Sequence, residues 1–159
     1  MARESKVALP RDSYNLRQLR KLAGANVKFH PDLLRALLLH VESNADRPVS
    51  SLSEIGIEGW TDEQIAYHVI LADEDGLLRA TLSEYPDAHD EDLIYVDYRV
   101  HRLTSRGHDF LAYTADGRAW KFIKATAARA GKDSVDALFQ IALTHGRKAI
   151  ENAVNAVFS

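Results

Sequence analysis

Serine, histidine and carboxylate side chains are the residues here that could support hydrolytic or metal-dependent chemistry. The run Ser105–Asp109 contains a serine, a histidine and an aspartate, but the members of a catalytic relay converge from separate segments. The run His89–Asp92 could hold a cation through oxygen ligands, although a charged loop tip explains the same residues. His101 and His108 lack the spacing of a His-Glu-x-x-His zinc motif.

Sequence motifs for cofactors and reactive thiols are also missing. The 159 residues contain no phosphate-binding loop and no dinucleotide fingerprint. They contain no cysteine, which excludes disulfides, thiolate catalysis and cysteine-ligated zinc. We therefore expect a protein that is not an enzyme, with no catalytic residues, no bound metal and no cofactor.

The charge of the chain is segregated, although the formal net charge is only −3. Residues 1–35 carry eight Lys or Arg and three acids, whereas residues 36–98 carry two Arg and fifteen acids. Residues 99–159 carry ten Lys or Arg and five acids. Asymmetry of this kind bears on binding partners more than the total charge does.

Apolar periodicity and start signals predict helices in the first third of the chain. A basic helix over about residues 12–22 has only a thin leucine stripe, which is typical of peripheral packing. A second helix is expected to begin at Pro31 and to end near Asn44–Asp46. Ser50 or Ser51 could cap a short helical turn that ends at Gly56.

The acidic middle of the chain predicts one further helix and a hairpin. Thr61 and Gln64 fit a capping box for a helix that runs to about Asp75. Residues 77–85 and 93–102 have strand character, and the second segment alternates as a half-buried strand does. The acidic loop over residues 86–92 joins them, so we expect an antiparallel hairpin with a charged tip.

Three more helices are expected after the hairpin. Thr104 should cap the first, a second should span about residues 118–130, and Asp133 or Ser134 should cap a last helix of about 24 residues. We expect a basic extension with one helix over residues 1–28 and a main domain over 29–114. The helices over 115–159 would pack on that domain, form a dimer interface, or do both.

The order helix, short helix, capped helix and hairpin is that of a winged helix-turn-helix, in which the hairpin is the wing. The expected fold class is therefore mainly α with a β-hairpin wing (α+β). A basic N-terminal helix would precede the winged helix, and a C-terminal helical extension would follow it.

Three strings carry a resemblance to a known family, namely Trp60–His68, Asp75–Leu78 and Leu103–Leu111. The last contains a Leu-Thr-x-x-Gly string, which also follows the wing in proteins similar to the multiple-antibiotic-resistance regulators. Together the strings resemble domain of unknown function 2513, a bacterial and phage family, over about residues 30–155. The resemblance implies a winged-helix fold and no particular activity.

The capped helix and the hairpin tip are the candidate site, because they carry nine acids and no Lys or Arg. A recognition helix lies beside DNA phosphates and depends largely on Lys and Arg, so insertion into a groove looks unfavourable. We expect instead a protein partner, itself basic or DNA-binding, to contact Asp62, Glu63, Tyr67, His68, Leu71, Glu74, Asp87 and Asp90. The acids could also merely solubilise an exposed face or mimic DNA, and His68 could be a histidine at the edge of the core.

An alternative function is a DNA-binding transcription regulator that uses its basic terminal segments. The candidate phosphate contacts are Arg11, Arg17, Arg20, Lys21, Arg118, Lys121 and Lys124. A solvated helix face would explain the same residues.

The last helix is apolar on more than one side, which indicates burial by two partners. Either it packs under the preceding helices of its own chain, or a homodimer covers it through Leu138, Phe139, Ile141 and Ala142. The sequence has no apolar run of the roughly 18–20 residues that a membrane helix needs. It also has no apolar signal-peptide core, so we expect a cytoplasmic protein.

Overall fold

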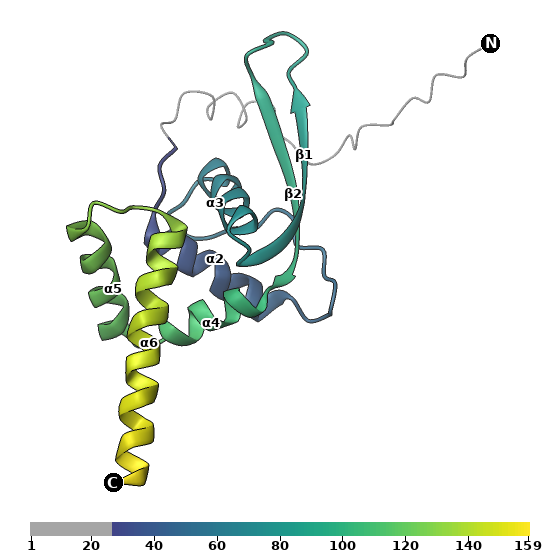
Figure 1. The fold of residues 1–159 in the computed structure, drawn as a ribbon. Coiled ribbons are helices and arrows are strands. Elements are labelled where there is room, and N and C mark those ends of the chain that lie inside the picture. Colours follow the sequence, from purple (N-terminus) through teal and green to yellow (C-terminus); the bar gives the residue numbers. More distant parts are fainter. Residues whose placement is uncertain (1–26) are drawn as a thin grey trace.

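The computed structural model describes residues 27–159, so the helix expected over residues 12–22 lies outside the described part. The described part is a mainly helical α+β arrangement of five helices and one antiparallel two-strand hairpin (Figure 1). In chain order the elements are α2 (Pro31–Asn44), α3 (Asp62–Glu74), β1 (Leu78–Pro86), β2 (Ile94–Leu103), α4 (Ser105–Tyr113), α5 (Gly117–Arg129) and α6 (Val135–Phe158).

Helix α2 forms the centre of the core, and its bounds confirm the prediction. Proline occupies its first turn, where the missing N–H costs nothing, and Asp32 places an acid at the same end. The helix packs against α3, α4, α6 and β2. Five of its apolar side chains are fully buried, namely Leu33, Leu34, Leu37, Leu38 and Val41.

The capping box predicted for α3 is confirmed. The Gln64 amide N–H donates to Thr61 Oγ1 at 3.2 Å, and the Thr61 amide N–H donates to Gln64 Oε1 at 3.1 Å. The helix ends before Gly76, whose φ of 69° lies in the left-handed region that glycine adopts without a steric penalty. These two signals fix both ends of α3.

The prediction of a short helix between Ser50 and Gly56 was wrong, because Ser50 and Leu52 pair with β2 and the rest of the segment is irregular. The amide of Ser50 donates to the His101 carbonyl at 3.0 Å, and Leu52 exchanges two 2.9 Å backbone hydrogen bonds with Val100. The unpaired edge of β2 thus offers this segment backbone hydrogen bonds, and a single turn of helix would form fewer of them. The segment forms an isolated bridge beside the hairpin.

The hairpin is antiparallel and runs from the pair Leu78–Leu103 to the pair Pro86–Ile94 at the tip. The pairing shifts by one residue between Arg79 and Ala80, where Asp73 Oδ1 accepts a 2.9 Å hydrogen bond from the Ala80 amide. Near the base the buried side chains are Leu78, Tyr98, Val100 and Leu103, which alternate with exposed ones, whereas side chains at the tip end of both strands are exposed. The alternation predicted for β2 therefore holds only in its inner half.

A close contact joins the turn after α3 to the first turn of α4. The Thr104 amide donates to the Leu77 carbonyl at 3.0 Å, and the Thr104 hydroxyl donates to the Gly76 carbonyl. The same hydroxyl oxygen caps α4 by accepting from the Gly107 amide at 3.1 Å, as predicted. A Cβ on Gly107 would lie 2.0 Å from the Leu77 oxygen, so only glycine fits there. The strings Asp75–Leu78 and Leu103–Leu111, which lie far apart in the sequence, thus form one structural unit.

Helices α5 and α6 complete the core on the side away from the hairpin (Figure 1). The ring of Trp120 in α5 lies edge-on to the ring of Phe110 in α4, with 6.1 Å between the ring centres. The Trp120 Nε1 donates to Asp32 Oδ1 at 2.8 Å. Ser134 caps α6 by accepting from the Ala137 amide, which confirms one of the two predicted caps. The first half of α6 is packed into the core, but every residue from 147 onward is exposed. None of the helices between residues 27 and 159 is both long enough and apolar enough to cross a membrane.

Candidate functional site

Helix α3 presents a mixed acidic and apolar side to the surface. Its opposite side is fully buried in the core through Ile65, Val69 and Ala72. Asp62 and Glu74, at the two ends of the helix, are exposed, as predicted for a contact surface. The predicted anchors Tyr67 and Leu71 are partly buried and keep some exposed area. The helix contains no Lys or Arg.

Glu63 differs from the other acids of α3 because its side chain is partly buried. Its Oε2 atom is shielded from solvent and has no hydrogen-bond partner among the described residues. Burial of the side chain raises the pKa of the Glu63 carboxyl. Of the acids predicted on this helix, Asp62 and Glu74 are therefore the accessible ones.

His68 does not lie on the exposed side of α3, because its side chain is fully buried. Its Nε2 accepts from the His30 amide at 2.8 Å, and its Nδ1 lies 2.7 Å from the Gln64 carbonyl oxygen. An amide can only donate and a carbonyl can only accept, so the proton sits on Nδ1 and the ring is neutral. Phe29 stacks on the ring at 5.6 Å. His68 thus joins α3 to the segment before α2, and it lies within the core rather than at its edge or on the exposed side.

The buried ring of His68 should make stability depend on pH. Burial lowers the pKa of His68 below its ordinary value of 6.5. The unfolded chain therefore takes up a proton at a pH where the folded chain does not. The contribution is complete above about pH 6.5 and is lost as the pH falls towards the folded pKa. Urea unfolding from about pH 8 to about pH 5 should show this loss, and His68→Gln should flatten it. An unchanged slope in His68→Gln would assign the dependence to other groups.

The acids at the hairpin tip hold the loop in shape. Asp87 Oδ1 accepts from the amides of His89 and Asp90 at 2.7 and 3.1 Å, and Oδ2 accepts from the Tyr95 hydroxyl at 2.8 Å. Hydrogen bonds from the His89 amide and the Tyr95 hydroxyl lower the pKa of Asp87. The predicted contact residue Asp90 is exposed, and its carboxylate accepts from the Asp92 amide at 3.1 Å. The tip is therefore negative and pre-organised.

The acids of α3 and those of the hairpin tip are not side by side. Helix α3 lies against the base of the hairpin, whereas the tip stands at its far end (Figure 1).

Tyr98 lies near the base of the hairpin, close to several acids. Its burial, and then the negative charges of Asp62, Asp97 and Glu54, raise the pKa of Tyr98. The Tyr98 hydroxyl accepts from the Ile55 amide at 3.0 Å.

Sequence reasoning missed Glu54 and Asp97 as part of the acidic region. Asp97 is on the strand face opposite Tyr98, and that alternation was the only available signal for it. Nothing in the sequence placed the segment of Glu54 beside β2, because the segment was expected to be helical. The acidic region therefore extends from the N-terminus of α3 to the middle of β2.

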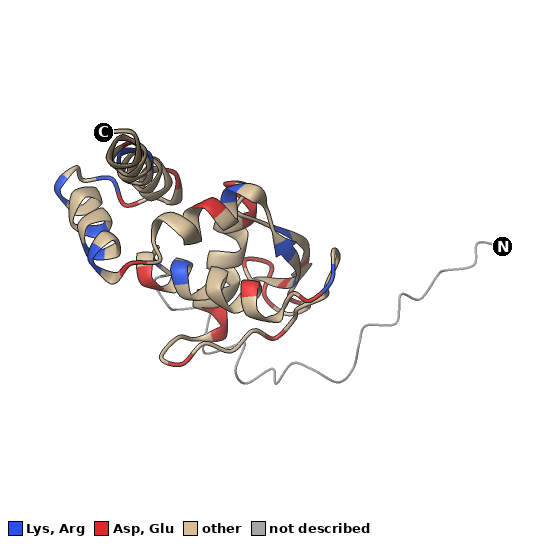
Figure 2. Cartoon of the chain, turned by 90° about the horizontal axis from the view of Figure 1, so that it is seen from below, with Lys and Arg blue, Asp and Glu red and all other residues tan. Residues whose placement is uncertain are grey.

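The predicted phosphate contacts have different surroundings. Arg118 and Lys121 are exposed on α5, which Figure 2 shows as a helix with several blue segments. Lys124 forms a 2.8 Å ion pair with Asp32 and lies 5.4 Å from the centre of the Trp120 ring. Its charge is thus partly satisfied within the chain. The other four residues lie outside the described part, namely Arg11, Arg17, Arg20 and Lys21.

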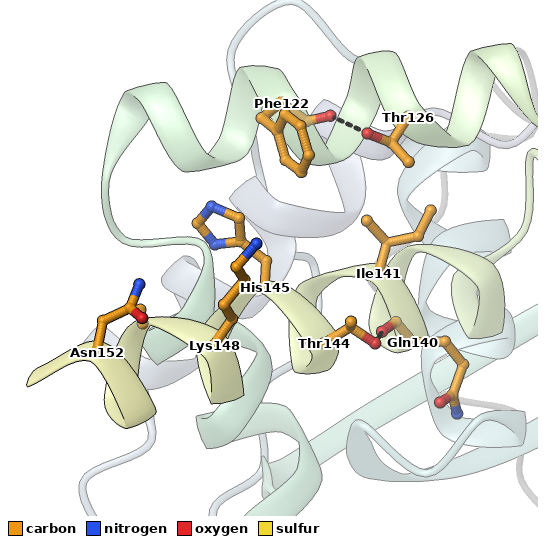
Figure 3. A pocket seen from close by; sticks show the side chains of 9 residues that line it. Phe122, Thr126, Gln140, Ile141, Thr144, His145, Lys148 and Asn152 are labelled. Atoms are coloured by element: carbon orange, nitrogen blue, oxygen red, sulfur yellow. Dashed lines mark hydrogen bonds between the residues drawn. The ribbon is translucent and has the colours of Figure 1, made fainter. Parts of the chain in front are cut away.

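The predicted dimer residues are mostly used within the chain. Leu138, Phe139 and Ala142 are buried in the core, so the alternative of packing under the preceding helices accounts for them. Ile141 is partly exposed and lines a groove of about 730 Å³ between α5 and α6. In Figure 3 the Phe122 side chain extends from α5 across this groove towards α6.

The polar groups of this groove offer little for chemistry. The hydroxyls of Thr126 and Thr144 donate to main-chain carbonyls of their own helices at 2.8 and 2.9 Å. The lining residues include Lys148 and His145 but no carboxylate. Elsewhere, His108 Nδ1 lies 3.6 Å from Glu42 Oε1 of α2. Within residues 27–159, no three His, Asp or Glu side chains are grouped as metal ligands.

A comparison with protein families matches this chain to one model, described as "Hypothetical protein (DUF2513)", over residues 28–133. The match begins near the predicted limit of 30 and contains all three strings, but it stops short of α6 and of the predicted limit of 155. No curated protein and no solved structure matches the chain significantly.

Proposed function

The chain belongs to the DUF2513 family, and from that premise we propose that it is a non-enzymatic winged-helix regulatory or adaptor protein. It binds a protein partner through an acidic surface made by α3 and the β1–β2 hairpin. The partner is basic, and a DNA-binding protein fits this description. The observation that carries the proposal is the accessible side of α3, which combines acids with partly exposed apolar side chains and has no Lys or Arg.

The order of elements supports the winged-helix assignment. Helix α2 is followed by the extended segment that bridges to Val100, then by α3, and then directly by the hairpin. Helix α3 contacts both strands at the base of the hairpin, where a recognition helix lies beside its wing (Figure 1). The described chain has no helix between Ala45 and Thr61, so the first helix of the usual helix-turn-helix pair is reduced to irregular structure.

The electrostatics of α3 favour a basic protein over a nucleic acid. Asp62 and Glu74 mark the ends of the accessible side, and Asp75 follows at its C-cap. Inserting this helix into a groove would bring these carboxylates towards DNA phosphates, which are spaced at about one charge per 1.7 Å of duplex. Tyr67 and Leu71 supply apolar area between the charges, and aromatic residues near the centre of an interface often dominate its binding energy.

Charge reversal on α3 tests this proposal. We expect Asp62→Lys/Glu74→Lys to weaken binding of partners captured from a bacterial lysate by about tenfold or more. The matched control is Asp46→Lys/Asp109→Lys, which makes the same change in net charge at exposed positions away from α3. Quantitative mass spectrometry of the retained proteins should show a partner held by the wild type and the control but lost in the α3 variant. Equal retention by both variants would refute the surface.

DNA binding through the basic segments is the competing outcome. Fluorescence anisotropy with random duplex DNA across a salt series should give affinity no tighter than about micromolar near physiological salt. Tighter binding with a steep salt dependence would favour a DNA-binding regulator. In that case Arg118→Glu/Lys121→Glu should reduce both the affinity and the salt slope, because these two cations are exposed on α5.

A further inference from the structure

The C-terminal half of α6 leaves the body of the protein with an apolar stripe uncovered. Ile150, Val154, Val157 and Phe158 are 55%, 47%, 76% and 84% exposed. They follow the buried Gly146 at helical intervals of three and four residues, so they continue the helix face that packs against the core. Figure 1 shows this half of α6 extending well beyond the other helices.

We propose that residues 147–158 of α6 pair antiparallel with the same segment of a second copy of this chain. The two-fold axis passes between Ala153 and Val154. This interface is independent of the acidic surface of α3 and the hairpin, which it leaves open on both copies. It also differs from the interface predicted from the sequence, whose residues lie in the first half of α6.

The stripe is complementary to itself in this register. The alanines of one copy face larger side chains of the other, and Ile150 of one copy faces the aliphatic Val157 of the other. The facing pairs are Ala149 with Phe158, Ile150 with Val157, and Ala153 with Val154, each occurring twice. Close approach of the two helices at Ala153 brings the β-branched side chains into contact on both sides.

The charges of the segment also favour the antiparallel arrangement. Helix α6 has no basic residue in its last turn, where the final carbonyls lack partners within the helix. An antiparallel copy places its Arg147 and Lys148 beside that end, where cations are stabilised. A parallel copy would instead place Arg147 against Arg147 and Lys148 against Lys148. The same four cations thus help one arrangement and oppose the other.

The geometry permits the pairing and limits its strength. The facing residues 149–158 of each copy span about 15 Å along the helix axis, and the two helices project from bodies that would lie at opposite ends of the pair. The overlap of two short helices buries less than the roughly 1,200 Å² at which stable interfaces begin. We therefore expect a concentration-dependent dimer with a dissociation constant of about 10–100 µM.

Sedimentation velocity across this concentration range tests the interface. The wild type should shift from monomer to dimer, and Val154→Glu should remain monomeric. The matched control is Asn155→Glu, which adds the same charge on the polar face of the same exposed segment and should leave the dimer intact. Both positions lie beyond the core, so circular dichroism should show equal thermal stability at monomeric concentrations. A monomeric wild type throughout, or equal effects of both variants, would overturn the proposal.

Cysteine cross-linking tests the register, because the chain contains no cysteine of its own. Val154→Cys lies next to the axis and should form a disulfide-linked dimer under mild oxidation. Ile150→Cys alone should not, because the two copies of this position are about 10 Å apart along the helix axis. Mixing Ile150→Cys with Val157→Cys should restore cross-linking. Efficient self-linking of Ile150→Cys would indicate a parallel pair and overturn the arrangement, as would binding of the stripe to anionic lipid vesicles without dimerisation.

Discussion

Replacing Phe110 with alanine should lower the free energy of unfolding by about 3–5 kcal/mol. The Phe110 side chain is fully buried and is the largest such side chain in the described core. It connects α4 to α5 through its edge-on contact with Trp120 at 6.1 Å. Alanine would leave a cavity between these helices, because the ring of Trp120 is held by its hydrogen bond to Asp32 and cannot move inward freely.

Urea unfolding followed by circular dichroism measures this loss, and α5 provides a matched control. The Phe122 side chain is 55% exposed, so Phe122→Ala should cost only about 1 kcal/mol or less. Equal losses in the two variants would show that Phe110 is less deeply packed than the structure places it. A loss confined to Phe110→Ala would confirm that α4 and α5 share one core.

Gly107→Ala should destabilise the protein by about 3 kcal/mol, against the usual preference of helices for alanine. In an unconstrained helix the same substitution would stabilise by about 1 kcal/mol. Here the added Cβ would lie 2.0 Å from the Leu77 carbonyl oxygen, which is main chain and also accepts the Thr104 amide. Relief of the clash requires α4 to move away from the turn after α3, which breaks that hydrogen bond.

Gly117, in the first turn of α5, is the control for this experiment. A Cβ on Gly117 meets nothing within 4 Å, so Gly117→Ala should be neutral or slightly stabilising. Thermal unfolding of the two variants should therefore give shifts of opposite sign or very different size. A stabilising Gly107→Ala would mean that α4 does not approach the turn at Leu77.

The helices and the hairpin could be predicted from sequence because their signals are local. The Thr61 capping box, Gly76 and the Thr104 cap fix ends through atoms a few residues away, and these ends agree with the structure. The segment from Ser50 to Gly56 could not be predicted in the same way. Its structure depends on the edge of β2, about fifty residues later, and its own sequence gives no sign of that partner.

The candidate site was predictable in composition but less so in exposure. The acids of α3 were evident, whereas the burial of His68 depends on Phe29 and His30, which pack on it from another segment. The apolar pattern of α6 indicated two covered sides. It could not show that Leu138 and Phe139 are covered by the same chain, because that depends on α4 and α5 packing against the first half of α6.

The outer half of the hairpin contributes no fully buried side chain to the core, so the length of the hairpin can change without changing the stability of the fold. Side chains from Glu84 to Pro86 and Ile94 are exposed, so strand residues could be added or removed there without disturbing the core. Adding two residues to each strand preserves which face each side chain occupies and extends the hairpin by about 7 Å. The reach of the acidic tip beyond α3 is thus an adjustable length, open to change in discrete steps while the helical body stays the same.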